Sequence, residues 1–391
     1  MSLLDGMRIL DLSTFSPVRF GTTVLADLGA DVIQIDRPRS SYPDDVPMLT
    51  SIEHPRWLWH SRNKRSIGLN LKHDGARQVL LHLVADADVL IEGFAPGTAA
   101  RLGLDYGSLS TVKKDLVYAS VTGFGQTGPY AGLGGHEMNY QAMGGVTAAM
   151  AAAHRGDPAI LPFPLSDSVA SLYAAVAVLA AVHRRDRTGL GACVDISIQD
   201  AVVSLFGYDA QYFWQQGITD PSEIEELGGS PANGAYATAD GKAVVLGAVE
   251  PSVWKRFCAA VGQPDLETAL PEEPERVRRE LVAIFGRRSR AEWQTLGDQG
   301  GLGLTPVLSL TDLLTDPHID HRGLVNEVEH PTLGLVRQLA TPINVDGGMP
   351  PSRWFEVPGG HTRVLLEELG IDESVRTALY EAEAVFDAEQ P

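Results

Sequence analysis

Three segments carry acid or base side chains that could move a proton. His136 and Glu137 are adjacent in the glycine-bounded stretch GGHEMNYQAMGG, and Asp167 begins the stretch DSVASLYAA. Glu250 precedes Pro251 in GAVEPSVW. A histidine such as His136 can act as a catalytic base. Each residue could equally have a purely structural role. Backbone groups of a loop can hydrogen-bond a histidine, and acids are favoured at helix N-termini. Local sequence leaves both explanations open.

The residues around Asp167 predict the beginning of a long helix. The stretch SVASLYAAVAVLAAVHRRDRTG has helical spacing and ends in basic residues and Gly189, which suit a helix C-terminus. We expect Ser166 to be the N-cap of this helix. Its first backbone N–H groups would then be available to a developing oxyanion. Glu137, by contrast, is expected to be exposed.

A cluster of basic residues contrasts with an acidic background. Arg37 and Arg39 occur in IDRPRS, and Arg62, Lys64 and Arg65 occur in SRNKRS. Both segments are predicted at strand ends, where an open α/β sheet binds its ligands. Because guanidinium groups match phosphate oxygens, the cluster suits a phosphate clamp. A solvated charged surface explains it equally well.

Several well-defined site motifs are absent from the sequence. The loop STFSPVRFGTT has one glycine where a dinucleotide site has G-x-G-x-x-G, so Asp36 gains no support as a ribose ligand. Neither a P-loop nor a G-x-S-x-G elbow occurs. His318 and His321 lack a carboxylate or cysteine set with metal-ligand spacing, and we predict no metal site.

Composition narrows the class of protein. The 391 residues include 50 acidic and 31 basic ones, and the formal net charge of -19 argues against a nucleic-acid partner. Cys193 and Cys258 are too few for a disulfide framework and fit a reducing cytoplasm. We predict no signal peptide in MSLLDGMRILDLS. We also predict no membrane span, because the longest apolar run, 169–182, is short and suits a buried helix.

The hydrophobic patterns predict a doubly wound α/β sheet up to about residue 125. The stretches MRILDLS, DVIQIDRP, RSIGLNL, DVLIEGF and LVYASVTGFG are typical of strands, and TTVLADLGA and GARQVLLHLVADA have helical spacing. A strand, a helix and a strand in succession indicate parallel pairing. The later stretch VDISIQDAVVSLFGYDAQYFWQQG is expected to lead away from this sheet.

A smaller α+β domain is predicted after a segment rich in glycine, proline, serine and acids. Asp240 and Gly241 predict a hairpin in GAYATADGKAVVLGAV. Ser289 and Glu292 have the spacing of a helix capping box. The predicted parts are a large domain at 1–205, a linker at 206–225, the small domain at 226–325, and a linker with C-terminal helices at 326–391 that return to the large domain.

Five stretches follow one another along nearly the whole chain: LADLGADVIQIDRP, DVLIEGFAPG, VTGFGQTGPYAGLGGHEMNY, DRTGLGACVDIS and GGHTRVLLEELG. Together they resemble the family III CoA transferases and their relatives, the α-methylacyl-CoA racemases. The resemblance implies a Rossmann-like large domain that binds coenzyme A rather than a dinucleotide. It also implies an interlocked homodimer, in which the small domain of one subunit closes the active site of the other.

The resemblance assigns roles to the three proton-moving candidates. GHEMNY is similar to the GHDINY segment of the racemases, with His136 in the histidine position. GAVEP is similar to their GAIEP segment, with Glu250 as the partner of that histidine. Asp167 matches an aspartate that is an acid or base in racemases and a nucleophile in transferases. All three racemase positions are filled, which favours a racemase of 2-methylacyl-CoA thioesters; a CoA transferase with Asp167 as nucleophile is the alternative.

The resemblance also implies how coenzyme A is bound. It enters as part of the acyl-CoA substrate, no cofactor is bound permanently, and Arg37, Arg62 and Lys64 would hold its phosphates. The acyl-CoA and a second copy of the chain are therefore the expected partners, and the acyl group is left open.

The sequence departs from its relatives at two places near the expected site. Val18 and Arg19 stand where relatives have Gly-Pro, and Ala95 replaces an arginine associated with CoA phosphate binding. Arg19 is a candidate to compensate for Ala95. The glutamine that transferases carry in the first βα loop is absent from STFSPVRFG. These departures also fit a CoA-binding protein that has lost activity.

Overall fold

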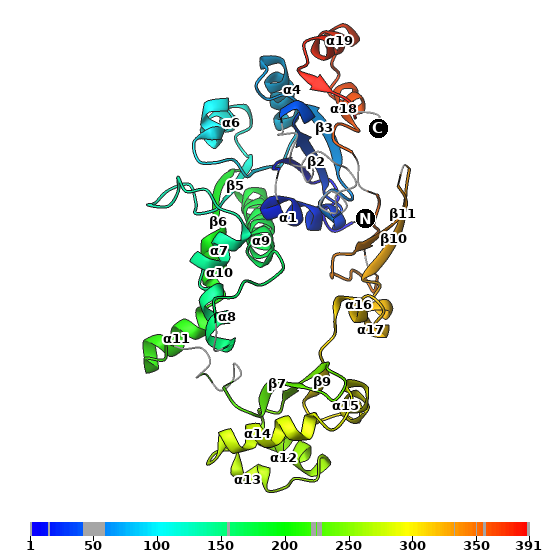
Figure 1. The fold of residues 1–391 in the computed structure, drawn as a ribbon. Helices are drawn as coiled ribbons and strands as arrows, with labels where there is room; N and C mark the ends of the chain where they lie inside the picture. The colour runs from blue at the N-terminus through cyan, green and yellow to red at the C-terminus, as the bar shows by residue number, and fades with distance from the viewer. Residues whose placement is uncertain are drawn as a thin grey trace. The chain divides into compact units, whose positions relative to one another are not determined.

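A seven-stranded sheet forms the centre of the first of two structural units (Figure 1). Its strands, in spatial order, are β12 (Val385–Phe386), β3 (Arg65–Leu69), β2 (Asp31–Asp36), β1 (Arg8–Leu12), β4 (Val89–Glu92), β5 (Val117–Thr122) and β6 (Ala192–Ser197). Strand β12 is antiparallel to β3, and the other neighbours are parallel. Strands β1 to β6 have the 3-2-1-4-5-6 order of a Rossmann sheet. The predicted α/β class with a parallel-sheet core is therefore confirmed.

The structure is a computed structural model, and it describes residues 2–14, 16–41, 59–154, 157–219, 224, 229–331, 333–348, 350–354 and 357–388. The chain divides into two units. The first comprises Met1–Val146, Ile160–Leu205 and Asp320–Pro391, and the second comprises Thr147–Ala159 and Phe206–Ile319. The longer segment of the second unit begins at Phe206, the first residue of the predicted linker at 206–225, of which residues 220–223 and 225 lie outside the described residues.

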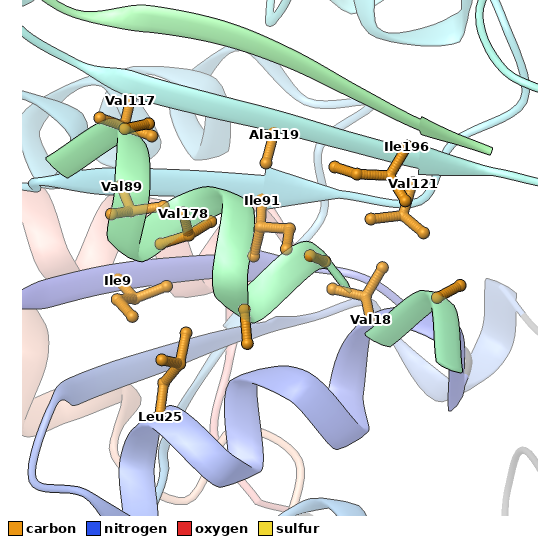
Figure 2. Close-up of a cluster of buried hydrophobic side chains, with 14 of the residues drawn as sticks. Ile9, Val18, Leu25, Val89, Ile91, Val117, Ala119, Val121, Val178 and Ile196 are labelled. Carbon is orange, nitrogen blue, oxygen red and sulfur yellow. The ribbon is translucent and has the colours of Figure 1, made fainter. Parts of the chain in front are cut away.

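The sheet is buried on both faces, which explains why its strands have apolar sequences. Alternate residues of a strand point to opposite faces. Ile9, Val89 and Val117 pack on one face against α1 (Ser16–Asp27) and α9 (Leu165–Thr188), as Figure 2 shows. Parallel sheets occur almost only with both faces covered, because their crossover helices pack there.

The opposite face of the sheet carries a second apolar cluster. Leu10 and Leu90 belong to it, and its helical residues come from α4 (Asp74–Ala85), α6 (Tyr106–Val112) and α18 (Thr362–Glu368). Each leucine buried in this way stabilises the fold by roughly 1.5–3 kcal/mol. With two apolar faces, the sheet leaves polar groups room mainly at the ends of its strands.

Helix α9 lies between the core and the surface of the first unit. Ala170, Ala174 and Val178 are buried against α1 and the sheet, whereas Tyr173 and Val176 are exposed. The prediction of a core helix is confirmed for the buried side. Among the described helices α9 alone is long and apolar enough to cross a membrane, a test that core helices of soluble proteins also pass.

Strand β6 extends the sheet beyond its predicted limit, so the expectation that VDIS leads away from the sheet is wrong. This strand pairs with β5 at the edge, and Cys193 and Asp195 are exposed there. Ser197 ends the strand and also caps α10 (Ile198–Ser204), where its hydroxyl accepts the N–H of Asp200 at 3.1 Å. No turn residue separates strand from helix, which is why the pattern was misinterpreted.

The C-terminal part of the chain returns to the sheet. Strand β12 pairs with β3, and the N–H of Gly68 in β3 donates to the hydroxyl of Thr362 at 2.9 Å. Further elements of this unit are η1 (Arg39–Ser41), α5 (Thr98–Leu102), α7 (Glu137–Met143), the hairpin strands β10 (Val325–His330) and β11 (Gly334–Leu339), and α19 (Glu373–Glu381).

The second unit contains a three-stranded antiparallel sheet of β7 (Asn233–Ala237), β8 (Ala243–Gly247) and β9 (Leu304–Pro306). Strands β7 and β8 form the hairpin predicted around Asp240 and Gly241, which confirms it. The capping box predicted from Ser289 and Glu292 is present at α15 (Arg290–Gly297). The remaining helices are α8 (Val146–His154), α11 (Gly207–Gln216), α12 (Pro251–Ala260), α13 (Leu266–Ala269), α14 (Pro274–Phe285), α16 (Leu310–Leu313) and α17 (Pro317–His321).

Gly21 marks a close approach of α1 to α9. A Cβ atom at this position would clash with the backbone carbonyl oxygen of Ser171. We expect Gly21→Ala to lower the free energy of unfolding by about 1–3 kcal/mol, the usual cost of overpacking. Gly207→Ala in α11, where nothing lies within 4 Å, is the matched control and should change stability by less than about 1 kcal/mol. Urea unfolding measures both variants, and equal effects would contradict the close approach.

Candidate active site

A cavity opens within the first unit at the carboxyl edge of the sheet. Its volume is about 910 Å³. Ser13 follows β1, Gly93 follows β4, and Thr122 ends β5; all three residues line the cavity. The strand order reverses between β1 and β4, and open α/β sheets bind their ligands at such a switch point. The cavity is therefore the candidate active site.

His136 and Asp167 both line this cavity, although they are far apart in the sequence. His136 is the N-cap of α7, its backbone N–H donates to Oδ1 of Asn139 at 3.0 Å, and its side chain is exposed. Asp167 is half-buried in the first turn of α9. The structure thus brings together two of the three predicted catalytic residues.

The N-terminus of α9 is capped by a distant residue rather than by Ser166. Pro164 occupies the N-cap position, and Ser166 lies inside the helix. The carboxylate of Glu137 accepts the N–H of Ser166 and the N–H of Asp167, each at 2.9 Å. Two further predictions are corrected here: Glu137 is half-buried rather than exposed, and these two N–H groups are not available to an oxyanion.

Gln141 forms hydrogen bonds both to Glu137 and to the segment that leads into α9. Gln141 is fully buried and lies one helical turn after Glu137 in α7. Its Nε2 donates to Oε1 of Glu137 at 2.8 Å and to the carbonyl of Leu161 at 3.1 Å. Its Oε1 accepts the N–H of Leu161 at 2.9 Å. This glutamine was not predicted as a site residue, because its spacing from Glu137 is the only feature of the sequence that indicates the contact.

Tyr140 forms part of the wall beside these carboxylates. Its hydroxyl donates to the carbonyl of Gly135 at 2.8 Å, and a Cβ atom on Gly123 or Gly135 would collide with its ring. Burial raises the pKa of Tyr140, and the negative charges of Asp167 and Glu137 raise it further. The phenol therefore stays neutral and acts as a hydrogen-bond donor and an apolar surface.

Glu92 is a buried carboxyl group that the sequence reasoning did not single out. It ends β4, and it accepts the N–H of Phe94 at 2.5 Å and the hydroxyls of Ser120 and Tyr118. Burial raises the pKa of Glu92, although these hydrogen bonds oppose the change. Because Phe94 lines the cavity, Glu92 holds one wall of the site in place. Its signal in the sequence was an acid at the end of an otherwise apolar strand.

Arg62 and Lys64 were predicted to hold CoA phosphates, but they are buried in ion pairs. Nη2 of Arg62 lies 2.7 Å from Oδ2 of Asp27, and Nζ of Lys64 lies 3.2 Å from Oδ2 of Asp11. Both cationic side chains are at most 2% exposed. Burial lowers the pKa of Lys64 to about 8, although the charge of Asp11 opposes this shift. Both residues therefore have a structural role in this chain, and their contact with CoA phosphates stays a prediction.

The other basic candidates differ in their exposure. Arg37 is exposed just after β2. Arg19, the candidate to compensate for Ala95, is buried; its Nη2 lies 2.8 Å from Oδ1 of Asp36 and donates to the carbonyl of Ser13 at 2.9 Å. Ala95 itself lines the cavity. Arg19 therefore supports the loop after β1 from inside and does not replace the missing arginine.

Glu250 belongs to the second unit, where it is the exposed N-cap of α12. Pro251 follows it at the first helical position, as the capping explanation requires. Its partnership with His136 stays a prediction. His318 and His321 lie in α17, and within the described part of the chain no group of histidine, cysteine and acidic residues could hold a metal ion.

Sequence comparison identifies the family. The model of CoA-transferase family III matches residues 4–362, so the chain belongs to this family. Succinyl-CoA:mesaconate CoA-transferase of Haloarcula marismortui is 32% identical, and the alignment covers 95% of this chain and 98% of that protein. Alpha-methylacyl-CoA racemase of Homo sapiens is 30% identical, with 94% of this chain and 93% of that protein covered. The chain is thus an enzyme of the transferase and racemase superfamily.

A solved structure supports the same assignment. A CAIB/BAIF family protein of Brucella suis has a TM-score of 0.80 and 25% identity, and the match covers 94% of this chain and 99% of that one. The mixed α/β fold with its parallel-sheet core therefore matches a solved structure of this family.

Removal of Lys64 or Arg62 is expected to affect stability. Lys64→Met leaves Asp11 as an unpaired buried carboxylate, and Arg62→Met does the same to Asp27, at a cost of about 3–5 kcal/mol each. Urea unfolding measures this cost. Lys72→Met, at an exposed position, is the control and should stay within about 0.5 kcal/mol of the unchanged protein. Normal stability of the Lys64 variant with weakened CoA binding, measured by calorimetry, would restore the phosphate-clamp hypothesis.

Proposed function

We propose that the protein is a racemase or epimerase of 2-methylacyl-CoA thioesters, which works by 1,1-proton transfer through an enolate. The observation that supports this proposal is the shared cavity, which is lined by both His136 and Asp167. Inversion at a carbon atom needs one acid or base on each of its faces, so two such groups in one cavity suit this reaction better than a single nucleophile does.

The walls of the cavity suit an apolar acyl group. Val18, Phe94, Leu133 and Ile198 supply apolar surface, and the part of the lining that the structure describes contains no lysine or arginine. A second carboxylate on the acyl group would meet two acidic side chains and, among the described lining residues, no lysine or arginine, which is unfavourable in a partly buried site. These walls favour a branched hydrocarbon acyl group over a dicarboxylic one.

In the proposed reaction, His136 removes the α-proton from one face of the thioester while Asp167 delivers a proton to the other. The opposite epimer reacts with the two roles exchanged. Glu250 is proposed to orient His136 and to favour its protonated form, as a carboxylate does for a histidine. Arg37 is the remaining candidate among the predicted ligands of the CoA phosphates.

The proposal includes an interlocked homodimer in the cytoplasm. Exposed apolar side chains on α9 and α10, among them Val176 and Val203, supply surface for a second copy of the chain. We expect light scattering to give twice the chain mass of 42.0 kDa. Val176→Asp should weaken the dimer because it introduces charges into the interface, and a monomer in the unchanged protein would contradict this part of the proposal.

The racemase proposal is tested with one epimer of a 2-methylacyl-CoA in D2O. We expect deuterium to enter the α-position and the opposite epimer to accumulate, both followed by NMR. His136→Ala and Asp167→Asn should each lower racemisation by about 10²- to 10⁴-fold, the usual contribution of an acid or base. Lys72→Ala, at an exposed position outside the lining of the cavity, is the control. Absence of both exchange and inversion across a panel of acyl-CoAs would refute the proposal.

A CoA transferase with Asp167 as nucleophile is the second candidate. It is supported by the similarity to the Haloarcula transferase and by the place of Asp167 in the cavity. An acyl-CoA with hydroxylamine, followed by mass spectrometry, distinguishes the two candidates, because only a transferase should yield a hydroxamate at Asp167. CoA binding without exchange or trapping would instead support an inactive CoA-binding protein.

A further inference from the structure

We propose that Glu137 is a positioning residue that sets the spacing between the two proton-transfer groups. This inference rests on the function proposed above. Glu137 follows His136 directly in the chain, and its two carboxylate oxygens accept the N–H groups of Ser166 and Asp167 at 2.9 Å. One side chain therefore joins the backbone that carries His136 to the backbone that carries Asp167.

The contact supplies the cap that α9 lacks locally. The first N–H groups of a helix have no partner within the helix, and Pro164 at the N-cap offers no side-chain acceptor. A carboxylate in this place accepts charge-assisted hydrogen bonds and faces the positive end of the helix dipole.

Gln141 gives this cap a fixed direction. Its Oε1 accepts the N–H of Leu161, so its amide nitrogen must face Glu137 and the carbonyl of Leu161. The glutamine is fully buried, which leaves its amide few alternative partners. Helix α7 and the first turn of α9 are thus held together by a short network of hydrogen bonds on the wall of the cavity.

Glu137 should affect proton transfer on the two faces of the substrate to different extents. The backbone of His136 is held within α7 itself, because its N–H donates to the side chain of Asn139. Asp167 depends on the first turn of α9, whose N–H groups Glu137 holds. Loss of Glu137 should therefore impair the face that Asp167 serves more than the face that His136 serves, whereas general destabilisation would impair both faces equally.

Hydrogen–deuterium exchange of backbone amides tests the cap without reference to activity. We expect Glu137→Ala to accelerate exchange of the amides of Ser166 and Asp167, because they lose their acceptor. Glu137→Gln should have a smaller effect, because an amide oxygen can still accept one of the two bonds. Asn139→Ala, which removes a hydrogen bond in the same turn of α7, should leave these amides protected. Unchanged protection in Glu137→Ala would overturn the proposal.

Isotope exchange with each 2-methylacyl-CoA epimer tests the positioning role. Asp167→Asn identifies the epimer whose α-proton Asp167 removes. For that epimer, Glu137→Ala should lower kcat about a hundredfold, since misplacement of a reacting group by about 1 Å can cost as much. Exchange from the other epimer should fall far less, and Glu137→Gln should restore part of the loss.

The outcomes separate this inference from the proposed function. An equal loss for both epimers in Glu137→Ala, with normal protection in Asn139→Ala, would reduce Glu137 to a structural residue and overturn the proposal. If the unchanged protein exchanges neither epimer, the proposed function fails. Amide exchange would then still decide whether Glu137 fixes Asp167, and hydroxylamine trapping at Asp167 in Glu137→Ala would replace proton exchange as the activity that should fall.

Discussion

The burial of the parallel sheet on both faces is the constraint from which the rest of the first unit follows. Apolar side chains such as Ile9 and Leu10 alternate between two covered faces, so the strands leave no face open to a polar ligand. Polar chemistry is therefore confined to the ends of the strands. The chain reverses its strand order between β1 and β4, and the loops that diverge there leave the space that becomes the cavity.

The burial of the sheet on both faces also explains why Lys64 and Arg62 form ion pairs. Charges near a covered sheet edge must be paired, and Lys64 and Arg62 are each buried against an aspartate from another segment. These pairs support the loops around the site from within. The protein has more acidic than basic residues. The described lining of the cavity contains two carboxylates and a histidine, whereas Lys64 and Arg62 are held in their ion pairs outside it.

Patterns within one segment could be predicted from the sequence, and contacts between distant segments could not. The hairpin at Gly241 and the capping box at Ser289 depend on residues a few positions apart, and both were predicted correctly. The cap of α9 was misassigned to Ser166 because its true acceptor, Glu137, comes from another helix. The ion pair of Lys64 with Asp11 could not be predicted for the same reason, since a basic residue near a strand end has one pattern whether it faces a phosphate or a buried aspartate.

The occupied N-terminus of α9 changes the electrostatics of the proposed reaction. With the amides of Ser166 and Asp167 bound to Glu137, the developing enolate oxygen needs donors from elsewhere in the site. The charges of His136 and Asp167 also contribute to the stability of the enolate in the proposed reaction. One proton shared between His136 and Asp167 gives either neutral histidine with a protonated acid, or imidazolium with a carboxylate, and each form is ready for one epimer. When His136 takes the α-proton it becomes a cation beside the enolate, so charge separation stays within the site. In the proposed partnership, the carboxylate of Glu250 would lower the free-energy cost of that cation.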